Sequence, residues 1–193
     1  TDEKSSASFQ NLKPALSGNG LAVAYVLTHE AFDVLKVVRF SDKGEVLRTD
    51  TFKLQGRVVS SPAISADGSY VAYLSSIESD GSTLGYGTFV YKLPKAQAAS
   101  GQAPELIFSE YSRDFKKSSA SWDWVNGVDM SNNGRYLAYS TVKISDESSA
   151  AESQVWVRDN DSKKSTMVFS KKRIPADDLS YLVKSISNDG NTL

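Results

Sequence analysis

The stretch Pro62-Ala-Ile-Ser-Ala-Asp-Gly68-Ser-Tyr-Val-Ala-Tyr73 decides the fold, because the chain repeats it. Related phrases run from Pro14 to Tyr25 and from Val128 to Tyr139, and a fourth runs from Ser185 to Leu193. Aligned on the glycine that ends the turn, successive phrases are 48, 66 and 56 residues apart. A phrase that recurs at such a spacing is typical of a repeat architecture, in which each repeat is one supersecondary unit.

Each phrase reads as a tight hairpin. A short strand ends in an apolar residue and a serine, a turn of Asn or Asp followed by Gly comes next, and in the three complete phrases a second strand ends in Ala-Tyr. The Asn/Asp-Gly pair is expected to supply the positive φ angles of a two-residue hairpin turn. The serine before the turn is placed to hydrogen-bond the turn backbone. Four unrelated hairpins are the alternative, and the recurrence of the pattern in register argues against it.

A second hairpin follows each complete phrase. Its strands are runs of β-branched and aromatic residues bounded by turn formers, which favour β-structure. They are predicted at 34–40 and 46–52, at 88–93 and 105–108, and at 154–158 and 165–169. Four antiparallel strands in each unit make a propeller blade. We therefore predict an all-β propeller with three four-stranded blades, at about 11–56, 57–110 and 120–170, and the start of a fourth blade at 180–193.

The repeated pattern resembles the WD40-like (PD40-type) repeat of TolB-like β-propellers. It consists of an apolar residue, Ser, any residue, Asp or Asn, and Gly, followed after two residues by an apolar residue and Ala-Tyr, and the strand Val155-Trp-Val-Arg-Asp159 fits the same family. The resemblance covers the chain from Asn11 onward. It implies a propeller but little about function, because such repeats occur in periplasmic TolB, in the propellers of prolyl-oligopeptidase-like enzymes and in many surface proteins.

Three blades and the start of a fourth do not close a ring, since propellers have about four to eight blades. We expect this chain to be part of a larger propeller, or two copies to associate and complete the ring. Residues 1–10 are interpreted either as a tail or, through residues 6–10, as the outer strand that closes the last blade.

The composition excludes several classes of function. The 22 Lys and Arg residues and 23 Asp and Glu residues give a net charge of −1, which provides no field for holding nucleic acid. There is no cysteine, which removes disulfides and sulfur-based zinc sites, and we expect no cofactor. No apolar run approaches the roughly 18 residues of a membrane span, so membrane insertion is not expected. Residues 1–8 are polar, so any export signal is expected to have been removed or to lie outside the chain, and the resemblance implies a periplasmic or extracellular location.

Catalytic motifs are missing from the sequence. His29 is the only histidine, and no Gly-x-Ser-x-Gly segment accompanies it, so a serine-hydrolase triad is not expected. Acidic residues in predicted loops keep a carboxylate-pair glycosidase open as an alternative. They are Asp80, Asp114, Asp123, Asp177 and Asp178.

The connections at the two ends of the blades differ in length. Because the strands alternate in direction, the turn after the first strand and the turn after the third strand lie on one face, which we name the short-turn face. The other connections lie on the opposite face, the long-connection face. They are predicted at 28–33, 76–87, 111–127, 143–153 and 171–184. Long connections on a rigid scaffold are where binding residues concentrate, so the long-connection face is the predicted site.

Aromatic and basic residues gather in two of these connections, and such residues are enriched at interface hot spots. The candidate binding residues are Tyr111, Arg113, Phe115, Lys116, Lys117, Trp122 and Trp124 in one connection, and Lys171, Lys172, Arg173 and Tyr181 in another. Alternatively, the tryptophans pack between blades and the lysines are solvated. We predict a non-catalytic binding or scaffold module that recognises a protein or peptide. The alternatives are the propeller of a larger prolyl-oligopeptidase-like peptidase, whose catalytic domain lies outside this chain, and a surface or adhesive protein.

Overall fold

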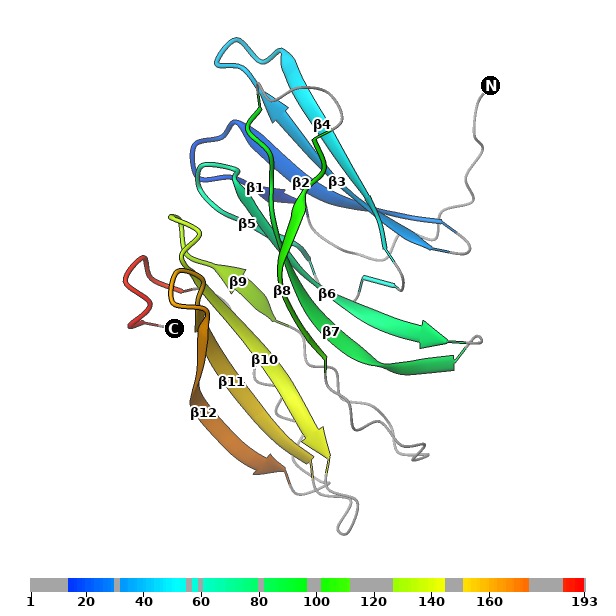
Figure 1. Ribbon diagram of the computed structural model, residues 1–193, viewed down its shortest axis with the longest axis vertical. Coiled ribbons are helices and arrows are strands. Elements are labelled where there is room, and N and C mark those ends of the chain that lie inside the picture. Colours follow the sequence, from blue (N-terminus) through cyan, green and yellow to red (C-terminus); the bar gives the residue numbers. More distant parts are fainter. Residues whose placement is uncertain are drawn as a thin grey trace.

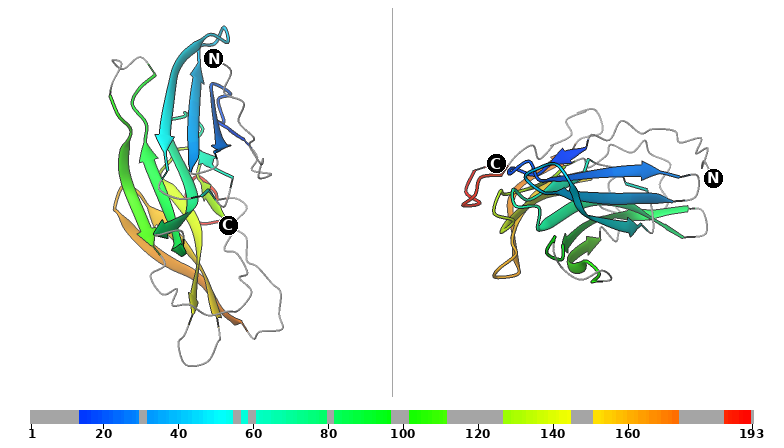
Figure 2. Two further views of the ribbon diagram at one scale, coloured as in Figure 1. Left: turned by 90° about the vertical axis from the view of Figure 1, so that its right-hand side faces the viewer. Right: turned by 90° about the horizontal axis from the view of Figure 1, so that it is seen from above.

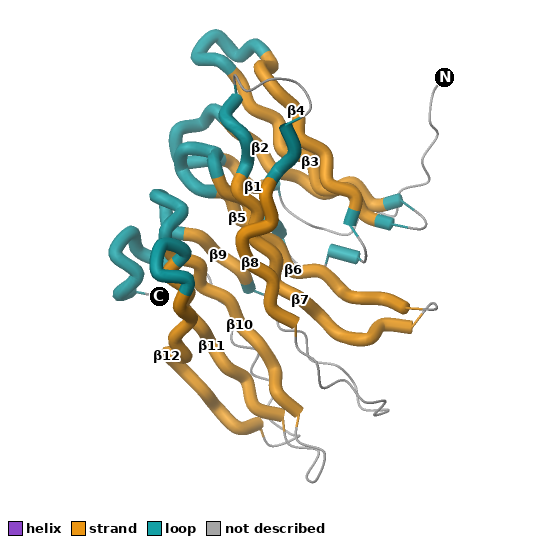
Figure 3. The backbone as a smooth tube through the Cα atoms, viewed as in Figure 1, coloured by secondary structure: helices purple, strands orange, loops and turns teal. Residues whose placement is uncertain are grey.

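The computed structural model describes residues 14–29, 32–54, 57–58, 61–79, 82–96, 102–111, 127–144, 151–173 and 186–192. Within these ranges all regular structure is β-strand, arranged in three separate four-stranded antiparallel sheets (Figure 1). The tube in Figure 3 accordingly shows only strands and the turns between them. The predicted all-β fold with three four-stranded blades is confirmed.

In each sheet the spatial order of the strands follows the chain, so each sheet is a meander. Blade 1 consists of β1 (Ala15–Leu16), β2 (Ala22–Thr28), β3 (Asp33–Phe40) and β4 (Val46–Lys53). Blade 2 consists of β5 (Ala63–Ile64), β6 (Tyr70–Ser79), β7 (Ser82–Lys92) and β8 (Glu105–Tyr111). Blade 3 consists of β9 (Val128–Met130), β10 (Tyr136–Ile144), β11 (Ala151–Asp159) and β12 (Lys164–Arg173).

Several strands extend beyond their predicted ends. The connection predicted over 76–87 is largely strand, because β6 reaches Ser79 and β7 begins at Ser82. The connection predicted over 143–153 is shortened in the same way by β10 and β11. The extension of β7 includes Gly85 and Gly87, which have little intrinsic strand propensity, but backbone pairing with β6 holds them. Pairing between β10 and β11 holds the second pair of extensions in the same way. The Asp80-Gly81 pair between β6 and β7 is a two-residue hairpin sequence, a signal that could have predicted this extension.

The turn of the repeated hairpin differs from the expected one. The glycine that ends each turn has φ between +70° and +74°, but among the described residues Lys163 alone has a positive φ without being glycine. Asn19 and its equivalents therefore keep negative φ, and the predicted two-residue turn is wrong. Instead, Gly20 N–H donates to the Ser17 carbonyl (2.9 Å) and Ser17 N–H to the Ala22 carbonyl (2.9 Å), which encloses a four-residue loop.

The serine of the repeat holds this loop together. Ser17 Oγ donates to Asn19 Oδ1 (2.7 Å) and accepts from Ala22 N–H (2.8 Å), while Asn19 Oδ1 accepts from Leu21 N–H (2.9 Å). The same three bonds recur around Ser65, Ser131 and Ser187. The predicted serine bond to the turn backbone is confirmed. The Asn or Asp residue stabilises the turn through its side-chain oxygen, which accepts hydrogen bonds, and not through a positive φ angle.

Neighbouring blades pack face to face (Figure 2). Apolar side chains fill the spaces between them. Leu35 and Val37 of blade 1 lie in one cluster with Val71 and Tyr73 of blade 2. A second cluster joins blades 2 and 3, where Leu74, Val90, Met130, Leu137 and Tyr139 are buried. The strands alternate between these two spaces with period 2, as expected for sheets that are covered on both faces.

The repeated hairpins also contact one another across the blades. Asn19 N–H donates to the Ala66 carbonyl (2.9 Å), and Ala66 N–H donates to the Asn132 carbonyl (2.7 Å). A Cβ atom on Gly134 would overlap the ring of Tyr70 in the preceding blade, so this glycine is required for close approach as well as for its φ of +71°. Residues 186–192 form the corresponding hairpin after blade 3, and Gly190 lies against Tyr136 in the same manner.

Candidate functional site

Four of the predicted binding residues lie at the ends of outer strands on the long-connection face. Tyr111 is the last residue of β8, and Lys171, Lys172 and Arg173 end β12. All four were expected in connections and are in strands instead, because β8 pairs with β7 as far as Tyr111 and β12 pairs with β11 as far as Arg173. The Lys171 side chain is exposed. The other predicted residues lie outside the described part of the chain: Arg113, Phe115, Lys116, Lys117, Trp122, Trp124 and Tyr181.

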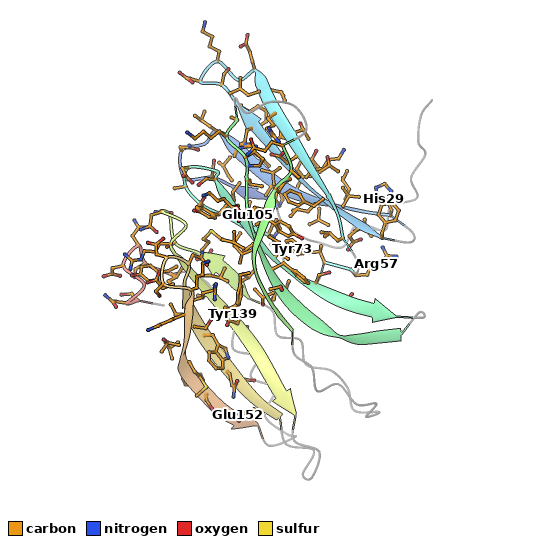
Figure 4. The ribbon with its side chains drawn as sticks, viewed as in Figure 1. His29, Arg57, Tyr73, Glu105, Tyr139 and Glu152 are labelled. Carbon is orange, nitrogen blue, oxygen red and sulfur yellow. The ribbon has the colours of Figure 1, made fainter. Side chains whose placement is uncertain are left out.

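A buried carboxylate links blades 1 and 2 at the long-connection face. Asp33 is fully buried, and its Oδ2 accepts from Val58 N–H (2.6 Å) while its Oδ1 pairs with the Arg57 guanidinium (3.2 Å). The same guanidinium donates to the His29 carbonyl, and the side chains of His29 and Arg57 lie close together in Figure 4. His29 is partly buried and stacks on Phe32 with 5.0 Å between ring centroids. These contacts give His29 a structural role.

A cavity of about 510 Å³ opens on the short-turn face between blades 2 and 3. Blade 2 contributes Tyr70, Lys92 and Glu105, and Figure 4 labels Glu105 at the start of β8. Blade 3 contributes residues of its two short turns together with the guanidinium of Arg158. The cavity lies opposite the predicted face. The sequence has a basic residue near the end of the third strand of each blade, at Arg39, Lys92 and Arg158, but this feature does not distinguish one junction from the other.

Arg158 joins the turn between β11 and β12 to blade 2. Its side chain is buried, with the guanidinium carbon 4.1 Å from the centroid of the Phe108 ring. It donates to Asn160 Oδ1 (3.2 Å) and to the Lys163 carbonyl (3.1 Å). A guanidinium over an aromatic face is held by the ring quadrupole, and desolvation strengthens this attraction. Arg158 therefore fixes the wall of the cavity.

Arg135 is the other arginine that lines the cavity, and it is already paired. Its guanidinium contacts Asp159 Oδ2 (3.0 Å) and Asp161 Oδ2 (3.3 Å). The hydrogen bond from Arg135, more than any other cause, lowers the pKa of Asp159 to about 2. This pair holds the β9–β10 turn against the β11–β12 turn within blade 3.

The equivalent space between blades 1 and 2 is occupied by the protein itself. Arg39 pairs with the buried Asp50 and donates to the Pro94 carbonyl, and Arg48 donates to the Gln102 carbonyl (2.5 Å). Pro94 and Gln102 belong to the connection between β7 and β8 of blade 2. At the first junction the two arginines are thus paired with a carboxylate and with two peptide carbonyls.

Two further kinds of site are absent from the described part of the chain. No group of three or more His, Cys, Asp or Glu side chains lies close enough to hold a metal ion there. The same residues contain no helix of the length and hydropathy needed to cross a membrane. The acidic residues that kept a glycosidase open all lie outside the described ranges.

Solved structures of similar shape identify the architecture. The β-propeller domain of the Trilobed protease from Pyrococcus furiosus aligns with a TM-score of 0.50 and 16% identity, over 86% of this chain and 44% of that one. The fold is a β-propeller. The tricorn protease aligns with the propeller at a TM-score of 0.51 and 16% identity, over 79% of this chain and 12% of that one. Acylaminoacyl peptidase, in complex with Z-Gly-Gly-Phe-chloromethyl ketone, aligns at 0.50 and 14% identity, over 83% and 24%.

At these identities the likeness shows the fold alone. The propeller described here spans less than half the length of each of these three solved chains. No family model matches its sequence, and no curated protein does. The TolB-like repeat family is therefore a resemblance of the sequence, and the partial propeller is what the structure shows.

Proposed function

We propose that this propeller is a non-catalytic module of a larger protein and that it binds a protein or peptide. The observation that carries the proposal is the alignment with three propeller-containing proteins, each named as a protease or peptidase. In all three, the aligned part is less than half of the solved chain. A rigid three-blade scaffold with the covered faces described above is suited to presenting connections to a macromolecular partner.

The long-connection face is the binding surface in this proposal. Tyr111 and Lys171 are in the last strands of neighbouring blades, which run in the same direction, so both strands end on this face. The connection from 112 to 126 contains Arg113, Lys116 and Lys117, whose charges are expected to attract an acidic partner surface.

Charge reversal tests this surface. A partner is first captured with the complete protein, and the variant Arg113→Glu/Lys116→Glu/Lys117→Glu is then compared with the unchanged protein across a salt series. We expect weaker binding and a smaller salt dependence, because interfacial charges steer association. The melting temperature should stay nearly constant, since exposed charges contribute little to stability.

The control variant is Asp42→Lys/Lys43→Glu, which changes two exposed charges on the short-turn face of blade 1. It should leave binding unchanged. Equal losses in both variants would contradict the choice of face, and failure of the complete protein to capture any protein or peptide would contradict the proposed function.

A second candidate function is the propeller domain of a larger prolyl-oligopeptidase-like peptidase. The alignment with acylaminoacyl peptidase over 83% of the propeller favours it. Labelling of the complete protein by a fluorophosphonate probe, followed by mapping of the labelled serine outside residues 1–193, would support this candidate. A complete protein that contains no reactive serine would exclude it.

A further inference from the structure

We propose that the cavity between blades 2 and 3 is a second binding site, and that it takes a short acidic peptide segment. The inference rests on the proposed function, because it takes peptide or protein binding as the role of the propeller. It concerns the short-turn face, so it can succeed or fail independently of the long-connection face.

The first step is the equivalence of Arg39 and Lys92. Arg39 pairs across the sheet with Ala22, and Lys92 pairs with Tyr70. Ala22 and Tyr70 hold the same position in the repeat, since the N–H of each donates to the turn serine of its own blade. The side chains of Ala22 and Tyr70 face the next blade, because Ala22 lies against Gly68 and Tyr70 against Gly134. Their cross-strand partners Arg39 and Lys92 are on the same face of the sheet. Lys92 therefore stands at the second junction where Arg39 stands at the first.

The second step is the difference between the two junctions. At the first, the connection between β7 and β8 supplies carbonyl groups to Arg39 and Arg48. At the second, only residues 160–163 connect β11 to β12. This turn is shorter than the 93–104 connection, and the 510 Å³ cavity lies in front of it. The space that the protein fills with its own backbone at one junction is open at the next.

The third step is the charge of the cavity. Lys92 and Lys163 make no side-chain hydrogen bond or ion pair among the described residues, whereas Arg135 is paired with Asp159 and Asp161. Glu105 lies directly opposite Lys92 on β8, and no ion pair forms between them. Two available ammonium groups therefore exceed the one available carboxylate. This excess favours a ligand that brings its own carboxylate.

The fourth step is the chemical class of the ligand. The partners of the cations at the first junction are the Asp50 carboxylate and two peptide carbonyls. A peptide with an Asp or Glu residue presents the same two kinds of acceptor. A volume of 510 Å³ lies within the roughly 300–1,000 Å³ of pockets that enclose small ligands, so it has room for a few residues. The Arg158 wall, fixed on Phe108, gives the site a preformed shape.

The experiment uses the 193-residue chain and a pair of synthetic peptides. The acidic probe is acetyl-Ala-Asp-Ala-Glu-Ala-amide, and the neutral probe replaces its Asp and Glu with Asn and Gln. Backbone amide shifts in ¹⁵N-labelled protein report both affinity and place. We expect the acidic probe alone to bind and to shift the amides of Lys92, Leu106 and Lys163.

The variant Lys92→Gln/Lys163→Asn removes both ammonium groups, and Asn tolerates the positive φ of residue 163. It should weaken the acidic probe by about tenfold or more, as expected when interfacial charges are removed. Lys43→Gln is the matched control, because Lys43 is an exposed turn lysine of blade 1 outside the cavity, and it should change nothing.

Four outcomes would overturn the proposal: no binding of the acidic probe, equal binding of the two probes, unchanged binding by the double variant, or glutarate binding as tightly as the acidic peptide. Glutarate distinguishes a free dicarboxylate from a peptide-borne carboxylate. A captured partner that depends on Arg113, Lys116 and Lys117, together with an acidic probe that does not bind, would overturn this site and leave the proposed function standing.

Discussion

The carboxylate of Asp129 accepts a hydrogen bond from the backbone N–H of Ile186, 3.0 Å away, and so connects β9 of blade 3 to the hairpin that follows it. Ile186 is buried, so its N–H has little access to water. Asp129→Ala should lower the free energy of unfolding by about 1–3 kcal/mol, the cost of an unsatisfied buried donor. Asp129→Asn keeps an acceptor oxygen and serves as the control in urea unfolding. Equal stability of the alanine variant and the unchanged protein would show that this bond contributes nothing.

The same carboxylate predicts a pH dependence. Burial is the largest influence on Asp129 and raises its pKa above the usual 3.8, so the folded protein holds this proton more tightly than the unfolded chain. The resulting stabilisation is present below 3.8 and is lost as the pH rises through the raised pKa. The difference in unfolding free energy between the unchanged protein and Asp129→Asn should therefore fall as the pH rises through that window. A difference that grows with pH would mean that the hydrogen bonds outweigh the burial.

The Asp159 carboxylate should respond in the opposite sense. Its pKa of about 2 is set first by the hydrogen bond from Arg135, so its stabilisation is present above 3.8 and is lost as the pH falls through 2. In Arg135→Gln the pKa of Asp159 should return toward 3.8, as measured by ¹³C NMR of the carboxyl group. Arg48→Gln, which changes an arginine of blade 1, should leave it unchanged. A titration of Asp159 near 2 in Arg135→Gln would assign the low pKa to the turn amides instead.

The turn serines should be more important to stability than their size suggests. Ser65 is fully buried, and its hydroxyl accepts from the N–H groups of Ser69 (3.1 Å) and Tyr70 (3.0 Å). Ser65→Ala should lower the unfolding free energy by about 1–3 kcal/mol, because it removes the acceptor of the Tyr70 N–H, whereas the Ser69 N–H keeps its bond to Asp67 Oδ1 (3.0 Å). Ser162→Ala, in an exposed turn, should stay within about 0.5 kcal/mol in the same denaturation series. Similar losses of unfolding free energy in the two variants would show that the turn serine does not stabilise the turn.

Substitutions at two glycines distinguish the energetic cost of backbone strain from that of inter-blade packing. Gly44 has a φ of +80° with open space around it, whereas Gly134 combines a φ of +71° with the Tyr70 ring of the neighbouring blade. Gly44→Ala should cost about 1–2 kcal/mol through its left-handed backbone alone. Gly134→Ala should cost more, because its new methyl group must also displace the Tyr70 ring. A calorimetric comparison of the two melting temperatures measures the packing contribution, and equal shifts would show that the ring moves freely.

The blades could be predicted from the sequence because the residues of the repeated phrase interact mainly with one another. Ser, Asx and Gly each make a short-range contact that the spacing alone specifies, so the hairpins follow directly. The extension of β6 and β7 has one sequence signal, the Asp80-Gly81 pair between them, because their own Ser and Gly residues are held in strands by pairing. The end of β12 could not be predicted, since its Ser and Lys residues are in a strand only through pairing with β11. The tryptophan predictions, that Trp122 or Trp124 packs between blades, concern residues outside the described ranges.

The cavity lay beyond sequence reasoning for a different reason. It depends on a comparison between two junctions: Lys92 of blade 2 faces a four-residue turn of blade 3, whereas Arg39 of blade 1 faces a longer connection of blade 2. Neither segment indicates a site when it is considered alone. The site arises from a mismatch in length between segments that are distant in the chain.

The hydrogen bonds from Asn19 to Ala66 and from Ala66 to Asn132 end on the carbonyl of the residue that follows the turn serine. Blades 1 and 2 thus each donate an N–H group to their successor, and blades 2 and 3 each accept from their predecessor through the same carbonyl position. A duplicated unit inserted between two blades would find both of its neighbours already complementary, with no compensating substitutions. Sequence differences among such copies can then accumulate in the connections. A single shortened turn opposite a lysine is enough to leave a cavity at a junction that would otherwise be filled.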